Sequence, residues 1–132
     1  MNLLPDTSVW SLAFRRDTPA GDEVKTLTRS LAEDSVVTTG LVLQELLQGF
    51  SAPKMREGIL ERFASLRYLV PDETDHVHAA ELRNLCRRNG VQIGTIDALL
   101  AQLCIRHDMV MLSADRDFVH AARHCPLVVW RA

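Results

Sequence analysis

LLPDTS, residues 3–8, is a short apolar run that ends on an acid and continues into residues that favour helix starts. The run predicts a strand, and Asp6 or Thr7 is suited to cap the helix that follows. The same order returns late in the chain, where the apolar run 109–112 predicts a strand and Asp115 comes soon after it. An acid therefore follows a predicted strand near both ends of the sequence.

Between these two stretches, short apolar or β-branched runs alternate with segments of helical period. Such alternation predicts an α/β domain whose central sheet is mostly parallel and carries helices on both faces. Thr39 and Thr95 are the expected N-caps of two helices, and Gly90 is the expected C-terminal glycine of a third. The predicted strands are 3–4, 35–38, 66–70, 109–112 and 127–130. The predicted helices are 9–14, 22–33, 40–50, 53–65, 73–89, 96–107 and 115–124.

Size and composition set the broad class of the chain. With 132 residues, 47% hydrophobic and 24% charged, the chain has an ordinary globular balance and is expected to form one domain over residues 1–132. No apolar run approaches the roughly 20 residues that a membrane-spanning helix needs. The first residues lack the segments of a signal peptide, and the three cysteines have no paired spacing. We therefore expect a cytoplasmic protein with reduced thiols and no membrane contact.

Four acids, Asp6, Glu45, Asp97 and Asp115, are candidates for one functional site. Ligands in parallel α/β proteins gather at the carboxyl ends of the strands. Asp6 and Asp115 follow predicted strands, and Glu45 lies early in the helix after the strand 35–38, so these acids are expected at the same sheet edge. No clear strand precedes Asp97, so the sequence alone does not place it. Converging carboxylates repel one another, and Mg²⁺ or Mn²⁺ would relieve that repulsion and suit phosphodiester hydrolysis.

The same acids also have a purely structural explanation. Asp6, Asp97 and Asp115 all lie near predicted helix starts, where an aspartate caps free N–H groups and suits the helix dipole. Glu45 is harder to explain in this way, because its neighbours in the helix are apolar nearly all round. A buried carboxylate without a partner is costly, so for Glu45 the functional and the structural explanations stand level.

In chain order, the frames around these acids are Asp6-Thr7-Ser8, Glu45-Leu46-x-x-Gly49, Asp97-Ala98-x-x-Ala101 and Ser113-x-Asp115-x-Asp117-Phe118. With these four frames the chain resembles, over its full length, the PIN-domain ribonucleases, specifically the VapC-type toxin of a type II (VapBC) toxin–antitoxin system. The resemblance implies a three-layer α/β/α sandwich with a mostly parallel central sheet. It also implies a Mg²⁺- or Mn²⁺-dependent endoribonuclease that cleaves structured RNA such as tRNA, binds a cognate VapB-type antitoxin and forms a homodimer.

The resemblance further implies roles for individual residues. The expected catalytic acids are Asp6, Glu45, Asp97 and Asp115, and the expected metal ligands are Asp6, Asp97, Asp115 and Asp117. The residues expected to orient these acids or to contact phosphate are Thr7, Ser113 and Arg116, with plain helix capping an equal possibility for the two hydroxyls. At the fourth frame we expect Asp115 to be the main ligand, with Asp117 acting through water or a second ion.

Other features bear on partners and on ordinary surface. The predicted helices 40–50 and 53–65 carry more apolar side chains than one face can hide, which suits an amphipathic partner segment. Arg15 and Arg16 follow the first short helix and are candidates for contact with an RNA backbone. The acidic and histidine-containing stretch 72–78 is expected to be solvated helix surface rather than a transition-metal site.

Pro5 departs from the family pattern, in which an aliphatic strand residue usually stands there. Because proline lacks an N–H, the end of the first strand is expected to be irregular, which keeps open a non-catalytic PIN-like interaction module whose acids only cap helices. An alternative enzyme is a haloacid-dehalogenase-like phosphatase, which also begins with a strand and an aspartate and needs Mg²⁺. That family places a second aspartate where this chain has Ser8 and uses a late lysine, whereas the last lysine here is Lys54.

Overall fold

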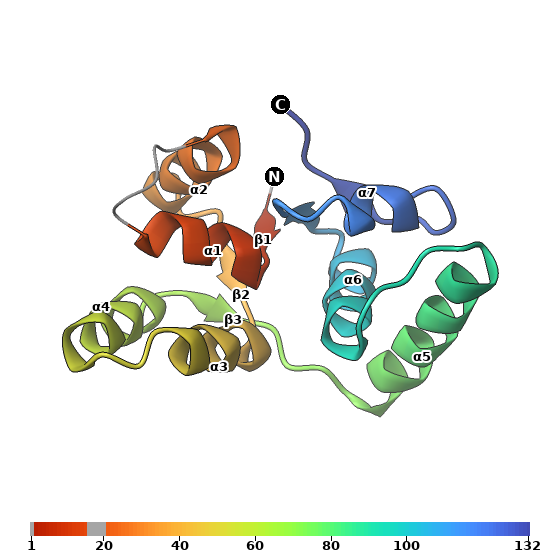
Figure 1. The fold of residues 1–132 in the computed structure, drawn as a ribbon, viewed down its shortest axis with the longest axis horizontal. Coiled ribbons are helices and arrows are strands. Elements are labelled where there is room, and N and C mark those ends of the chain that lie inside the picture. The colour runs from red at the N-terminus through yellow and green to blue at the C-terminus, as the bar shows by residue number, and fades with distance from the viewer. Residues whose placement is uncertain (1, 16–20) are drawn as a thin grey trace.

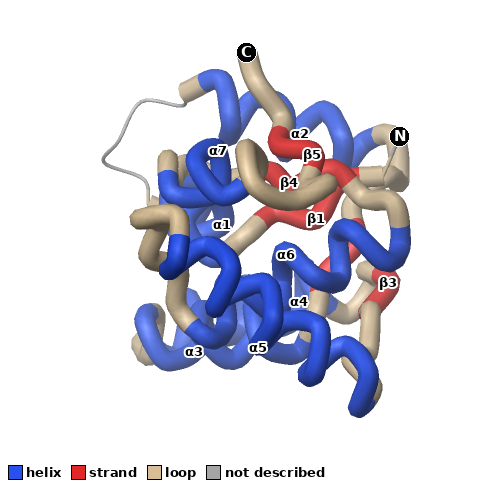
Figure 2. The backbone as a smooth tube through the Cα atoms, turned by 90° about the vertical axis from the view of Figure 1, so that its right-hand side faces the viewer, coloured by secondary structure: helices blue, strands red, loops and turns tan. Residues whose placement is uncertain are grey.

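The computed structural model describes residues 2–15 and 21–132, and within them five short strands lie at the centre, all paired in parallel (Figures 1 and 2). The strands are β1 (Leu3–Pro5), β2 (Val37–Thr38), β3 (Arg67–Tyr68), β4 (Val110–Leu112) and β5 (Val128–Val129). β1, β4 and β5 pair in that order, β2 pairs with β3, and an isolated bridge between Leu3 and Val36 joins the two parts. The strand order is therefore β3–β2–β1–β4–β5, with β1 in the middle.

Pro5 explains why the sheet divides beside its central strand. The Leu3 N–H donates to the Ser35 carbonyl on the β2 side, whereas the Asp6 N–H donates to the Leu112 carbonyl on the β4 side. Since successive residues of a strand face opposite neighbours, the missing N–H of Pro5 faces β2. The expected irregularity is thus confirmed on one side only. β1 stays in register with β4 as far as Pro5 opposite Leu112, and its pairing with β2 stops at the single bridge.

Helices cover both faces of the strands and give the predicted α/β/α sandwich. The helices are α1 (Thr7–Phe14), α2 (Asp22–Ala32), α3 (Gly40–Gly49), α4 (Pro53–Phe63), α5 (Glu73–Arg88), α6 (Thr95–His107) and α7 (Asp117–Ala121). α1 contacts α2 and α3, and α3 contacts α4, while α5 packs along α6 on the right of the view in Figure 1. Every residue from Ala98 to Cys104 is buried, so α6 forms the centre of the core on its side of the sheet. None of the helices in the described ranges is both long and apolar enough to cross a bilayer.

The predicted helix ends are confirmed in most places and corrected in two. The side chains of Asp6 and Thr39 each accept a hydrogen bond from the backbone N–H three residues later, and Gly90, just beyond α5, has a φ of 79°. Thr95 is not a cap, because it is the first residue of α6 and follows Gly94, which has no side chain to bond. The helix predicted over 115–124 is also wrong in extent, since α7 begins only after Asp115 and Arg116 have formed a turn.

Candidate active site

Asp6 directly follows β1 and is buried, with 4% of its surface exposed. Its Oδ1 accepts hydrogen bonds from the Ser8 hydroxyl at 2.6 Å and the Val9 N–H at 3.2 Å, and its Oδ2 accepts from the Ser113 hydroxyl at 2.6 Å. Burial raises the pKa of the Asp6 carboxyl, these hydrogen bonds lower it, the charge of Asp115 raises it, and the net shift is upward. Both carboxyl oxygens are therefore fixed in orientation, although the negative charge is poorly compensated.

Two serines tie the end of β1 to the end of β4. Besides donating to Asp6, the Ser8 hydroxyl accepts the Ala114 N–H at 3.0 Å, and the Ser113 hydroxyl accepts the Asp115 N–H at 2.9 Å. The two hydroxyl oxygens lie 3.5 Å apart. The expected contact of Ser113 with the acids is therefore present, and Ser8 makes an equivalent contact that the sequence had not singled out.

Glu45 reaches the site from α3 through Thr7. The Thr7 hydroxyl donates to Oε1 of Glu45 at 2.7 Å, which ties the first residue of α1 to the second turn of α3. The helix around Glu45 is less deeply buried than its apolar sequence suggests. Val42 and Leu46 are buried, whereas Glu45 itself is half-buried. A partner and partial solvation together relieve the cost that a lone buried carboxylate would carry.

Asp97 is the acid on which the charges of the others act together. It is half-buried in the first turn of α6, directly before the buried centre of that helix. Burial, followed by the negative charges of Asp6, Asp115, Glu45 and Asp117, raises the pKa of Asp97 to about 6. The acid that the sequence left unplaced is therefore the one with which all four other candidates interact.

Asp115 and Asp117 differ in how they meet the rest of the site. Both are exposed, and Oδ1 of Asp115 accepts the Asp117 N–H at 2.9 Å, so one oxygen of Asp115 caps the turn that leads into α7. Asp115 acts more strongly than Asp117 on the pKa of Asp97. Asp115 thus combines a local capping contact with the stronger coupling to the acid cluster.

The donor set of this cluster fits a hard divalent cation. Its candidate ligands are all carboxylate oxygens, which Mg²⁺ and Mn²⁺ prefer. In residues 2–15 and 21–132 both ion pairs are made by Arg106, so no described lysine or arginine neutralises the acids. In the same ranges no three His, Cys, Asp or Glu side chains form a ready-made metal site. The chemistry of the residues fits the ion, whereas their side-chain positions are not those of a closed cage.

Of the arginines expected to contact RNA, Arg116 and Arg15 lie within the described residues. Arg116 is exposed and lines a hollow of about 440 Å³ together with Ser113 and Asp115. Arg15, at the end of α1, is exposed as well, while Arg16 lies outside the described residues. Of the expected phosphate contacts, Arg116 is therefore the one whose position beside the acids is described.

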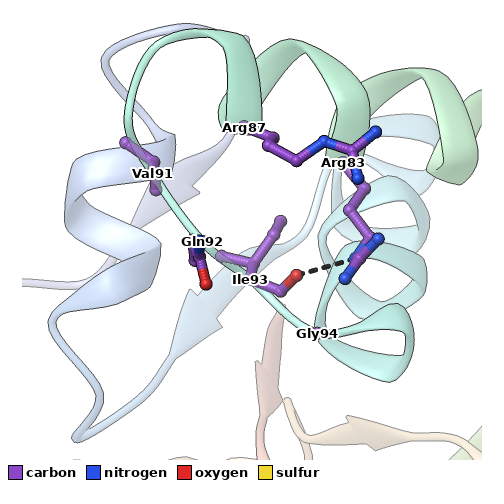
Figure 3. A pocket seen from close by; sticks show the side chains of 6 residues that line it. All are labelled: Arg83, Arg87, Val91, Gln92, Ile93 and Gly94. Carbon is purple, nitrogen blue, oxygen red and sulfur yellow. Dashed lines mark hydrogen bonds between the residues drawn. The ribbon is translucent and has the colours of Figure 1, made fainter.

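A second hollow, of about 390 Å³, lies beside the start of α6 (Figure 3). Arg83 and Arg87 of α5 line it on one side, and residues 91–94 line it on the other. Nε of Arg83 donates to the Ile93 carbonyl at 2.9 Å. This bond holds the segment that leads into α6, and so it helps to position Asp97. Nothing in the local sequence marks Arg83 for this contact, because its partner is ten residues away in an irregular segment.

Comparison with known proteins identifies the family and the fold. A family model described as the PIN domain matches residues 3–124 of the chain. The DNA-bound VapBC structure from Salmonella typhimurium is 19% identical, with a TM-score of 0.76 and coverage of 98% of this chain and 97% of that one. The FitAcB structure from Neisseria gonorrhoeae is 20% identical, with a TM-score of 0.72 and coverage of 98% and 96%. VapC20 of Mycobacterium tuberculosis, described as a Sarcin-Ricin loop cleaving toxin, is 18% identical, with a TM-score of 0.67 and coverage of 91% and 95%. At these identities the likeness to the solved structures is one of fold.

Proposed function

The chain belongs to the PIN domain family, and we propose that it is a metal-dependent endoribonuclease, the toxin component of a toxin–antitoxin pair. Its substrate would be structured RNA such as tRNA. The observation that carries the proposal is geometric: Thr7, Ser8 and Ser113 hydrogen-bond to Glu45 and Asp6 and join them to the segment that carries Asp115, while no described lysine or arginine forms an ion pair with these acids. The raised pKa of Asp97 agrees with a place near the same acids. Such uncompensated charge is costly to a fold and is common where acids serve a reaction.

The proposed ligands of the cation are Asp6, Asp97 and Asp115, with Asp117 in an outer position. When bound, Mg²⁺ or Mn²⁺ supplies neutralising charge to the phosphate and lowers the pKa of an attacking water. The residues of the chain supply orientation. Ser8 and Ser113 fix the two oxygens of Asp6, and Thr7 fixes one oxygen of Glu45. Preoriented acids of this kind need little reorganisation during the reaction.

The two alternative functions differ in what supports them. The phosphatase alternative loses support, because the PIN domain model spans residues 3–124 and Ser8 stands where a second catalytic aspartate would be needed. The non-catalytic module keeps one supporting observation, since Asp6 and Asp115 do accept backbone N–H groups at helix starts. Capping alone does not account for Glu45, which lies in the second turn of its helix.

A cleavage assay distinguishes the ribonuclease from the non-catalytic module. The purified chain should cut a total tRNA preparation in Mg²⁺ or Mn²⁺, and EDTA should stop cleavage reversibly. Asp6→Asn should abolish cleavage, because it keeps the shape of the side chain and removes its charge. Asp108→Asn is a matched control, since Asp108 is exposed beyond the far end of α6 and its φ of 55° suits asparagine. Cleavage by Asp6→Asn at the parent rate, or cleavage that survives EDTA, would contradict the assignment.

The proposed antitoxin site is an apolar hollow of about 560 Å³ between α1 and α4. Phe14, Ala52, Met55 and Gly58 line it, and Lys54, Glu57 and Glu61 contribute charges. Phe14 and Met55 are half-buried, so a partner segment could cover apolar surface that is still open to water. The hollow lies on α4, one of the two helices whose apolar content predicted a partner surface.

The partner proposal has its own test. A candidate antitoxin, sought in the reading frame next to the one that encodes this chain, should bind it, and Met55→Asp should weaken that binding by placing a charge in the hollow. Ala80→Asp, on the exposed face of α5, is the control. Light scattering of the purified chain should show a homodimer. A monomer at every concentration would contradict the dimer alone and leave the antitoxin site standing.

A further inference from the structure

The hollow beside Asp115 has an aromatic wall. It measures about 440 Å³, and its apolar lining comes from Trp130, Val129 and Val119. All three side chains are half-buried, so each presents some surface to the hollow, and Val129 and Trp130 also pack against the core. Ser113 and Asp115 line the same space, which makes the hollow continuous with the acid cluster. Its size falls within the roughly 300–1,000 Å³ of ordinary small-molecule sites.

The hollow is lined by charges of both signs as well as by apolar side chains. Arg116 and Arg131 are exposed and line it, and both can bind phosphate oxygens. Glu23 of α2 also lines it and, together with Asp115, would repel a phosphate. A polyanion entering the hollow is therefore attracted to the arginines, while a neutral group can occupy the apolar part.

Trp130 is held in place by the sheet. Its backbone N–H donates to the Met111 carbonyl at 2.9 Å, which extends the contact of β5 with β4 by one residue. An indole on a rigid element loses little conformational freedom when a flat partner stacks on it. Aromatic side chains beside basic residues are the usual means by which proteins hold unpaired bases.

We propose that this hollow binds one unpaired nucleobase of the RNA substrate, stacked on Trp130, with an adjacent phosphate on Arg131. The inference rests on the proposed ribonuclease function and adds a subsite to it. Because a base must be unstacked from its neighbours to enter, the chain would select RNA whose cut position lies beside a bulge, loop or single strand rather than inside a continuous duplex. The selection would be made by Trp130, outside the acid cluster.

Binding without cleavage tests this subsite. In EDTA, the parent chain is titrated with 5′-fluorescein hexa-adenylate and with the matching hexamer that lacks bases, and anisotropy gives the affinity for each. Hexa-adenylate should bind about ten-fold or more tightly than the abasic hexamer, since stacking on one aromatic side chain has about that effect. Unlabelled hexa-adenylate should also quench tryptophan fluorescence. The other tryptophan, Trp10, is 1% exposed, so it should not respond.

Variants separate stacking from charge. Trp130→Leu should lose about ten-fold or more in affinity for hexa-adenylate and nothing for the abasic hexamer. Trp130→Phe should keep most of the affinity and lose the fluorescence change. Arg131→Gln should weaken both hexamers equally. Arg123→Gln removes the same charge from an exposed position that does not line the hollow, and should leave both affinities unchanged.

The outcomes distinguish this proposal from the one on which it rests. Equal binding of the two hexamers, or undiminished binding of hexa-adenylate by Trp130→Leu, overturns the stacking site even if the parent chain cleaves RNA. A stacking signal in a chain that cleaves no RNA with either metal overturns the ribonuclease and leaves the subsite. Thermal unfolding checks each variant. Should Trp130→Leu fail to fold, the fluorescence change of the parent chain and its absence in Trp130→Phe decide.

Discussion

The two ends of α6 meet aspartates in opposite electrostatic states. At its start, Asp97 lies among like charges, and its pKa is raised to about 6. Near its end, Gln102 and Arg106 both contact Asp75 of α5, and the pKa of Asp75 is lowered. The surroundings of Asp75 therefore stabilise its charged form, whereas the surroundings of Asp97 destabilise its charged form. The difference separates an acid that holds two helices together from one whose charge lies among like charges.

Asp75 shows what a satisfied buried carboxylate looks like in this chain. Its side chain is fully buried, which raises its pKa, but hydrogen bonds from the Asp72 N–H, Gln102 and Arg106 outweigh burial. Asp72 and Asp75 also form a reciprocal capping box at the start of α5, with bonds of 2.9 and 3.0 Å. Arg106 contacts Asp72 as well, at 3.2 Å. Nothing comparable surrounds Asp97 within the part of the chain that the structure describes.

The largest expected effect is on catalysis, through Asp97 at the start of α6, where the pKa is raised. Asp97→Asn should lower the rate of RNA cleavage by about a hundred-fold or more, the range seen when a single group that stabilises a transition state is removed. Initial rates at saturating Mg²⁺ provide the measurement, with Asp108→Asn as control. Asp75→Asn, assayed at a temperature where it is folded, should retain the parent rate. Loss of activity in both variants to the same degree would erase the functional half of the comparison.

The second largest expected effect is a loss of stability near the end of α6, where Arg106 pairs with Asp75. Asp75→Asn should lower the free energy of unfolding by about 2–3 kcal/mol, somewhat less than the loss of a partner in a fully buried ion pair because Arg106 is 41% exposed. Urea unfolding at pH 7 measures it. Asp34→Asn removes an equal charge at an exposed position with a φ of 56° and should change stability little. A loss below about 0.5 kcal/mol, which is the scatter of surface substitutions, would mean that the Asp75 cluster is not stabilising.

The opposite pKa shifts of Asp97 and Asp75 should give opposite contributions to the pH dependence of stability. Between its unfolded pKa near 3.8 and its folded pKa near 6, Asp97 binds more protons when folded, so its effect is to stabilise the fold as pH falls from 7 to 5. Asp75 has a lowered pKa and keeps its contribution throughout this window. Asp97→Asn should be about 1 kcal/mol more stable than the parent at pH 7, after allowance for solvent screening, and the difference should shrink at pH 5. A difference that grows at pH 5 would reverse the assignment.

The smallest effect concerns Asp117. Asp117→Asn should slow cleavage about ten-fold, as for a group that acts through an outer contact. Asp115→Asn should cost more, because Asp115 couples more strongly to Asp97. Rates for both variants at saturating Mg²⁺ give the ranking. If Asp117→Asn proves the more damaging, then Asp115 serves mainly as the cap of α7 and Asp117 takes its place in the cluster.

Sequence periodicity was sufficient for the fold, because strand-to-helix order depends on local patterns. It placed Asp6 and Asp115 correctly after β1 and β4, each within a few residues of the end of a short apolar run. The ends of α7 and the cap of α6 were wrong for a local reason. The Asp115 side chain accepts the Asp117 N–H, so α7 begins later than predicted. α6 begins one residue earlier than predicted, so Thr95 is its first residue and Gly94 takes the cap position.

The features that the sequence did not predict depend on contacts between distant segments of the chain. No strand precedes Asp97, and its place follows from the packing of α6 against α5 and from the bond of Arg83 to Ile93. The stretch 72–78 reads as solvated surface, and His76 and His78 are indeed exposed, but Asp75 is fully buried because Arg106 reaches it from another helix. Sequence patterns give no access to pairs of this kind when the partners lie 31 residues apart.

Pro5 has a consequence for how the molecule opens. Because only a single bridge joins β1 and β2, we expect the part built from β2, β3, α3 and α4 to open locally before the β1–β4–β5 ladder does. Amide hydrogens at Asp6 and Trp130 are then expected to exchange more slowly than the one at Leu69, which bonds to Thr38. Glu45 belongs to the part that opens, and the other acids belong to the part that stays. We therefore expect the proposed active site to span two cooperative units and to be complete only while both are closed.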